Sequence, residues 1–140
     1  MRASAVILLT MGMLLCFWGK AQSRPEAERA ALEAAQSWLN LVDREKYGES
    51  WEEAASYFKG AVSREQWQQS MESVRKPLGK KLSRTLKSEQ ERTSLPGAPD
   101  GEYVVIQFQT SFEHKRAAIE TVTPMKERNG KWRVSGYYIK

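Results

Sequence analysis

The sequence predicts an α+β fold, with three N-terminal helices packed on one face of a curled four-stranded antiparallel sheet. Between Pro25 and Val74, apolar residues recur at steps of three and four, which is typical of helices that bury one side. After Gly79 apolar and polar residues alternate, which indicates half-buried strands. All helical patterns precede all strand patterns, and this order favours a segregated α+β domain. A chain of 140 residues suits one such domain.

The first two predicted helices cover Pro25–Val42 and Tyr47–Phe58. Proline is favoured in a first helical turn, and Trp38 lies on a stripe of small and apolar residues along the first helix. Gly60 follows the second pattern, and glycine often ends a helix because it adopts positive φ readily. We therefore expect two helices joined by a short polar segment.

The third predicted helix begins after Ser63. Ser63 followed by Gln66 matches a capping box, in which side chain and backbone form reciprocal hydrogen bonds. Pro77 and Gly79 then stop the helix. Its expected buried stripe consists of Trp67, Met71 and Val74.

Four strands are predicted after this helix, over Lys80–Glu89, Glu102–Phe112, Ala118–Arg128 and Lys131–Lys140. Residues 93–101 are rich in turn-forming residues and predict a loop between the first two strands. The first strand is weak and rich in lysine, which discourages pairing with other chains. We therefore expect it at one edge of the sheet.

Asn129-Gly130 predicts a two-residue type I′ turn between the last two strands. Counting from this turn pairs Met125 with Val134, Val122 with Tyr137, and Thr121 with Tyr138. The face expected under the helices consists of Ile119, Met125, Trp132, Val134 and Tyr138, and the solvent face of Glu120, Lys126, Arg133 and Ser135. Pro124 cannot donate to a strand ladder, so a bulge there would shift the pairings beyond it by one residue.

The N-terminus has the pattern of a secretory signal peptide. Met1-Arg2 is followed by an uncharged, apolar run over Ala3–Trp18, and Gly19-Lys20-Ala21 supplies small residues for cleavage after Ala21. The run is shorter than the roughly 18–20 apolar residues of a spanning helix. We therefore expect residues 1–21 to be removed and residues 22–140 to form one periplasmic or secreted domain.

Two alternatives stay open for this N-terminus. It could persist as an uncleaved anchor, or Cys16 could be lipidated, although its bulky neighbours depart from the bacterial lipobox. After cleavage the domain has no cysteine, which excludes thiol catalysis, thiolate metal sites and disulfides. The loss of Arg2 and Lys20 lowers the net charge from +5 to +3, a mild excess that does not indicate nucleic-acid binding.

Five segments carry a family resemblance: Val62–Trp67, Arg75–Gly79, Leu95–Phe108, Glu120–Thr123 and Gly130–Ile139. Together they resemble the bacterial family called domain of unknown function 4019, over roughly Ala27–Lys140. The resemblance implies an exported bacterial protein with an NTF2-like or cystatin-like cone. The family has no established activity, so the resemblance assigns no catalytic residue.

Residues for a metal centre, a catalytic triad or a nucleotide loop are scarce. His114 is the only histidine, and it lies at an expected turn beside Lys115 and Arg116. The chain has no phosphate-binding glycine loop, and Asp100-Gly101-Glu102 is too sparse for a calcium site. We therefore predict no catalytic residue, no metal and no cofactor.

Two groups of residues are candidate binding sites. A cone can leave a cavity between sheet and helices, and its candidate lining is Trp67, Met71, Phe108, Trp132 and Tyr138. A basic segment could contact anionic lipid head groups or wall polymers, and consists of Arg75, Lys76, Lys80, Lys81, Arg84 and Lys87. The alternative interpretations are a filled core and a solvated, protected edge strand.

These patterns favour a non-enzymatic envelope protein that binds a partner protein or a small apolar ligand, with membrane-surface contact as a further interaction. The alternative is an isomerase- or hydrolase-type activity inside the cone. Such an activity needs a cavity above about 300 Å³ with convergent polar side chains. A filled core with an exposed apolar patch favours a protein partner instead.

Overall fold

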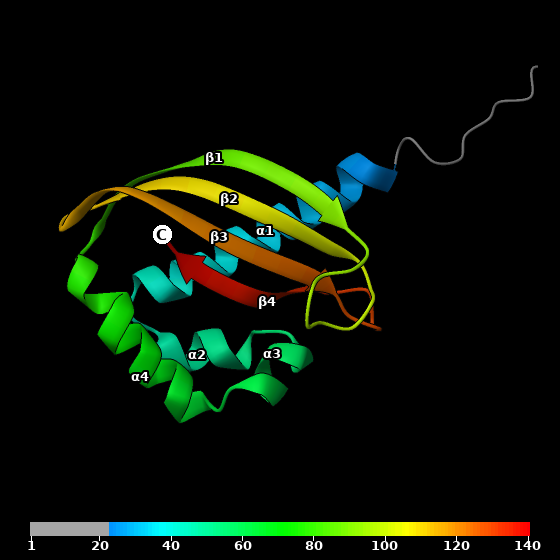
Figure 1. Cartoon of the computed structure of the whole chain (residues 1–140), viewed down its shortest axis with the longest axis horizontal. Coiled ribbons are helices and arrows are strands. Elements are labelled where there is room, and N and C mark those ends of the chain that lie inside the picture. Colours follow the sequence, from blue (N-terminus) through cyan, green and yellow to red (C-terminus); the bar gives the residue numbers. More distant parts are fainter. Residues whose placement is uncertain (1–22) are drawn as a thin grey trace, which may run out of the picture.

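The computed structural model describes residues 23–140 and confirms an α+β fold with the helices before the strands (Figure 1). The predicted signal peptide and Cys16 lie outside these residues. The elements are α1 (Ser23–Asp43), α2 (Tyr47–Glu52), α3 (Ser56–Ala61), α4 (Arg64–Val74), the 3-10 helix η1 (Lys76–Leu78), β1 (Lys81–Arg92), β2 (Tyr103–Phe112), β3 (Lys115–Lys126) and β4 (Trp132–Ile139).

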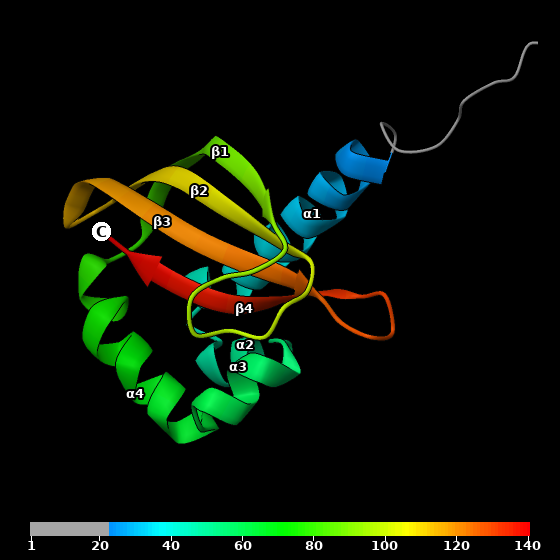
Figure 2. The same cartoon turned by 45° about the vertical axis from the view of Figure 1, so that its right-hand side comes forward.

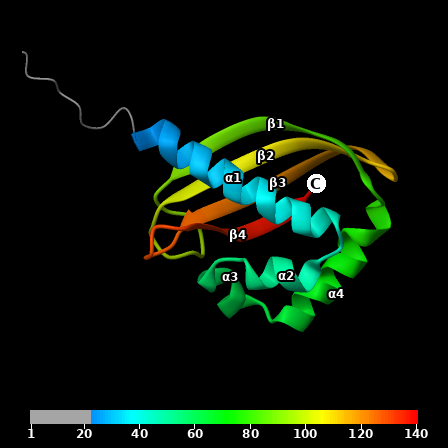
Figure 3. The same ribbon diagram turned by 180° about the vertical axis from the view of Figure 1, so that it is seen from behind.

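The sheet is antiparallel in the order β1-β2-β3-β4 and does not close into a barrel. Figure 3 shows α1 crossing one face of the curved sheet, with α2, α3 and α4 gathered beyond β4. The loop between β1 and β2 reaches toward α3 (Figure 2), where the Tyr57 hydroxyl donates to the Gly97 carbonyl at 2.7 Å. Among residues 23–140, no helix is long and apolar enough to span a bilayer.

The core lies between the sheet and the helices, with α1 against the strands and side chains from α2, α3 and α4 completing it. Ala31 and Ala35 are fully buried, and their small side chains let α1 approach the strands closely. Aromatic rings fill the remaining space: the Trp38 and Tyr137 centroids lie 5.2 Å apart in an edge-on arrangement. The indole of Trp38 donates to the Ser50 carbonyl at 2.8 Å, which satisfies its buried N–H group.

The predicted second helix is wrong in one respect, because it is split into α2 and α3. Ala54 and Ala55 are fully buried between them, and the backbone N–H of Ala55 donates to the Val134 carbonyl of β4 at 2.8 Å. This contact holds Ala55 in an extended conformation and breaks the helix. Gly60 lies inside α3, without positive φ, so it does not end a helix as predicted.

The capping box at the start of α4 is confirmed, since the Ser63 side chain accepts from the Gln66 backbone and the Gln66 side chain accepts from that of Ser63. The expected buried stripe is confirmed only in its first part, because Val74 is 52% exposed. Arg75 turns inward instead, and its guanidinium lies 4.4 Å from the Phe112 ring centroid.

The turn between β3 and β4 is longer than the predicted type I′ turn. Gly130 has a φ of 83°, but Asn129 has no positive φ, whereas type I′ requires it at both positions. The Gly130 N–H donates to the Glu127 carbonyl at 2.9 Å, and the first strand pair is Lys126 with Trp132. The turn therefore sets a register one residue away from the prediction.

The bulge at Pro124 restores the predicted register farther along. Near the turn Pro124, not Met125, pairs with Val134, so that predicted pair is wrong. After the shift between Thr123 and Pro124, Val122 pairs with Tyr137 and Thr121 with Tyr138, as predicted before any bulge. A one-residue shift exchanges the two faces of a strand. Hence Glu120 is fully buried under the helices, and Tyr138 is 58% exposed.

Candidate functional site

Three adjoining hollows follow one flank of α1, and we call them together the α1 groove. The first hollow, of about 530 Å³, lies between α1, the end of β1 and the β3–β4 turn. The second, of about 420 Å³, lies between α1, α2 and β4. A hollow of about 500 Å³ connects them, and Trp132 lines all three. Each volume is within the range of small-molecule sites.

The α1 side of the groove is built from Ala27, Ala30, Ala34 and Ser37. These positions recur at steps of three and four and share one helix flank, beside the stripe that faces the sheet. Their small side chains leave space against the half-buried indole of Trp132. The groove is therefore a consequence of two neighbouring small-residue stripes on α1, one packed and one open.

The rim of the groove carries both charge signs. At the first hollow the Lys126 ammonium lies 3.6 Å from the Glu102 carboxylate. At the second, the Arg133 guanidinium donates to the Glu53 carbonyl at 3.2 Å and to its carboxylate at 3.3 Å. These pairs are partly or largely exposed, so each adds little to stability. A mixed rim around small and aromatic residues suits an uncharged or amphipathic occupant.

The residues predicted to line a cone cavity do not come together around one. Trp67, Met71 and Phe108 are buried in the filled core, with exposures of 6%, 5% and 2%. Tyr138, placed on the core face by the predicted register, points to the opposite face because of the bulge. Of the five predicted residues, Trp132 lines the α1 groove, where it borders all three hollows.

The predicted basic segment separates into two groups. Arg75 and Arg84 turn inward and pair with buried carboxylates, so they are unavailable to an outside surface. Four lysines stay exposed: Lys76, Lys80, Lys81 and Lys87.

A buried charge network joins α1 to β1 and β3. The Arg84 guanidinium donates to both carboxylate oxygens of Asp43, at 2.7 and 2.9 Å, and to Glu120 at 2.7 Å. Arg75 donates to Asp43 at 3.2 Å. The hydroxyls of Thr110, at 2.5 Å, and Tyr137 donate to the two oxygens of Glu120. The network therefore balances two carboxylates with two guanidinium groups inside the fold.

The electrostatics of this network are dominated by Arg84. Burial alone would raise the pKa of Asp43, but the hydrogen bonds and charge of Arg84, the hydrogen bond of Arg75 and the charge of Lys81 lower it below its usual value. Burial would lower the pKa of Arg84, and the two carboxylates raise it instead. Burial and the adjacent Glu120 raise the pKa of Tyr137 well above its usual value. The lowered pKa of Asp43 thus keeps this carboxylate ionised at neutral pH beside the guanidinium of Arg84.

Glu120 was expected on the solvent face, and sequence reasoning did not identify it as part of a network. One signal was present: Arg84 shares a predicted strand face with two leucines, and a cation on an apolar face needs a buried partner. Within residues 23–140, no three His, Cys, Asp or Glu side chains gather as a metal site.

Residues 34–137 match the family described as "Protein of unknown function (DUF4019)". No curated protein matches the chain. The description names no activity, so a function has to be inferred from the groove, the charge network and the surface.

Proposed function

This chain belongs to the DUF4019 family, and we propose that it is a non-enzymatic binding protein of the bacterial envelope. Its α1 groove would hold a short extended segment of a partner protein. The single observation that carries the proposal is the position of Trp132, which borders all three hollows of the groove. Half-buried tryptophans with access to a groove are common energetic centres of protein interfaces.

The shape of the groove supports a polypeptide occupant. Ala27 and Ser37 are ten residues apart, which corresponds to about 15 Å along a helix at about 1.5 Å per residue. An extended segment covers this distance with about five residues, at roughly 3.3 Å each. The three hollows are spaced along this line, as side-chain pockets for such a segment would be. The two ion pairs of the rim already neutralise each other's charges. They therefore favour an occupant with uncharged polar groups, such as a peptide backbone.

A catalytic role has weaker support than binding. The acids and the tyrosine that could act in acid–base chemistry belong to the buried charge network. Glu120 is fully buried, and both of its oxygens accept hydrogen bonds within the fold. A general acid or base must reach substrate within about 3 Å or through one water. The buried position and the hydrogen bonds of Glu120 therefore favour a structural role for this residue.

Site-specific photo-crosslinking in the producing cell tests the proposal. A benzophenone amino acid replaces Ser37 on the groove flank, and in a matched control it replaces Glu72, an exposed helical position on α4. We expect a discrete protein adduct from position 37 and none from position 72. Ala34→Arg, which fills the groove without removing a core side chain, should abolish the adduct, and so should Trp132→Ala.

The outcomes separate the proposal from its competitors. Equal adducts from both positions, or an adduct that persists in Ala34→Arg, would overturn the groove proposal. An adduct of a few hundred daltons at position 37 would replace the protein partner by a small apolar ligand. Circular dichroism of each variant distinguishes a lost contact from a lost fold, which matters most for Trp132→Ala because that indole also packs against the core.

A further inference from the structure

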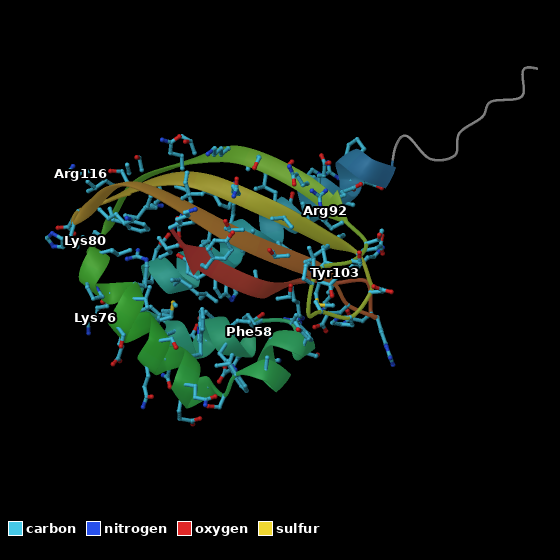
Figure 4. All side chains as sticks on the ribbon, in the orientation of Figure 1. Phe58, Lys76, Lys80, Arg92, Tyr103 and Arg116 are labelled. Atoms are coloured by element: carbon cyan, nitrogen blue, oxygen red, sulfur yellow. The ribbon has the colours of Figure 1, made fainter. Side chains whose placement is uncertain are left out.

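Positive charge collects at one end of the molecule, where η1, the start of β1 and the β2–β3 turn meet. The His114 N–H donates to the Leu78 carbonyl at 2.9 Å, and the Glu113 N–H donates to the Lys80 carbonyl at 3.0 Å, so these segments lie side by side. Figure 4 shows Lys76, Lys80 and Arg116 at this end. We call it the basic end, and its residues are Lys76, Lys80, Lys81, Lys115 and Arg116.

The charges of the basic end are largely uncompensated. Within residues 23–140, Lys76, Lys80 and Arg116 form no ion pair, whereas Lys81 has only a 3.7 Å contact with the network residue Asp43. Glu113 is the acid of the β2–β3 turn, and its carboxylate accepts from the Lys80 backbone N–H at 2.7 Å. The exposed lysines are therefore free to meet an external anionic surface.

Apolar side chains protrude beside these charges. Leu82 is 50% exposed and lies where the β1–β2 register shifts, between the pairs of Lys81 and Ser83. Val74, at the end of α4 and two residues before Lys76, is 52% exposed. Exposed apolar side chains beside cations are the combination with which interfacial segments enter the head-group region of a bilayer.

We propose that the basic end docks onto the anionic head groups of a lipid bilayer. Its charges come from three separate elements spread over one end, which suits a broad surface better than a narrow peptide. The register shift at Leu82 also interrupts the β1 edge there, so an added peptide strand would lack a continuous ladder. Each lysine or arginine near an anionic membrane contributes on the order of fivefold to binding.

This surface leaves the first hollow of the α1 groove accessible. Arg92 and Tyr103, which line that hollow, lie at the opposite end of the molecule from Lys76, Lys80 and Arg116 (Figure 4). A protein docked through its basic end would therefore present this hollow away from the bilayer. The two interactions use different residues, so each can fail without the other.

Vesicle co-sedimentation of the protein, as the cell processes it, tests the proposal. The vesicles contain either phosphatidylcholine alone or phosphatidylcholine with about 30% phosphatidylglycerol, enough charge for electrostatic binding. We expect binding only to the anionic vesicles and its loss in roughly 1 M salt, where charges are screened within a few ångströms. Lys80→Gln/Arg116→Gln should weaken binding by roughly thirtyfold, and Leu82→Ser should weaken it further.

A charge-matched control is Arg92→Gln/Arg128→Gln, which removes two exposed cations near the β3–β4 turn and the end of β1. This control should keep its affinity for the vesicles. Equal losses in both double variants would attribute binding to net charge alone and overturn the assignment to the basic end. Equal binding to neutral vesicles would overturn it as well. Displacement by millimolar inorganic phosphate or by an acidic peptide at micromolar concentration would identify an ion or a protein partner instead of lipid.

Discussion

Replacing Arg84 with methionine should remove a large part of the stability of this fold. The guanidinium makes three hydrogen bonds of 2.7–2.9 Å to two carboxylates, Asp43 and Glu120, and its side chain is only 10% exposed. Methionine fills a similar volume but leaves the fully buried carboxyl group of Glu120 without its guanidinium partner and with only two hydroxyl donors. Breaking a buried ion pair on one side costs about 3–5 kcal/mol, a substantial share of the roughly 5–15 kcal/mol of a typical domain.

Urea unfolding at neutral pH, followed by tryptophan fluorescence, measures this loss. With a typical slope of about 1–3 kcal/mol per molar urea, the midpoint should fall by about 1 M or more. Glu120→Gln should restore part of the stability in the Arg84→Met background, since an amide removes the buried charge and keeps hydrogen-bonding capacity. In the wild-type background the same change should destabilise, and this sign reversal identifies the pair as coupled.

Two results would refute this reasoning. If Arg84→Met lowers the free energy of unfolding by less than about 1 kcal/mol, the network contributes no more than a weak surface ion pair. Additive losses in the Arg84→Met/Glu120→Gln variant would mean that the two groups act independently. If Arg84→Met fails to fold, Arg84→Lys keeps the charge without the planar fork and should give a smaller, measurable loss.

Three further predictions concern pH and local geometry. The folded-state pKa of Asp43 is lowered, so the contribution of Asp43 to folding stability is present above about pH 3.9, its ordinary pKa. This stability is lost as the pH falls further, through the lowered pKa. Asp43→Asn should therefore flatten the acid limb of a curve of stability against pH. The pKa of Tyr137 is raised, so the contribution of Tyr137 to folding stability is present below about pH 10 and is lost at higher pH. Tyr137→Phe should reduce this loss of stability at alkaline pH. Gly130→Ala should cost about 1–2 kcal/mol in thermal unfolding because φ is 83°, whereas Gly60→Ala, in a helix with open space around its Cβ, should be neutral or stabilising.

The order of helices and strands could be predicted from the sequence because each helical or strand pattern depends only on neighbouring residues. The start of α4 at Ser63 and the edge position of β1 both follow from a few neighbouring residues. The break between α2 and α3 could not be predicted in this way. It depends on a hydrogen bond between Ala55 and Val134, which are far apart in sequence.

The candidate site was harder to predict because it depends on strand register. The sequence predicts Trp132 as a lining residue, and it borders the α1 groove, but Trp67, Met71 and Phe108 belong to the core and Tyr138 lies on the opposite face of the sheet. The pairing of β3 with β4 is shifted by one residue at the turn, and the bulge at Pro124 reverses this shift farther along the strands. The shift at the turn decides whether Glu120 or Ile119 faces the helices. Residue pattern alone cannot distinguish a longer turn from a type I′ turn when both contain Asn-Gly.

The charge network has a consequence for how the chain acquires its structure during synthesis. Its members are distributed from Asp43 on α1 to Tyr137 on β4, the last strand of the fold. Until the last strand is available, α1 lacks a partner for much of its buried stripe, and the carboxylate of Glu120 lacks one of its hydroxyl donors. A nascent chain therefore cannot complete this network before β4 has been synthesised. Until then the incomplete domain leaves apolar surface accessible to chaperones and proteases.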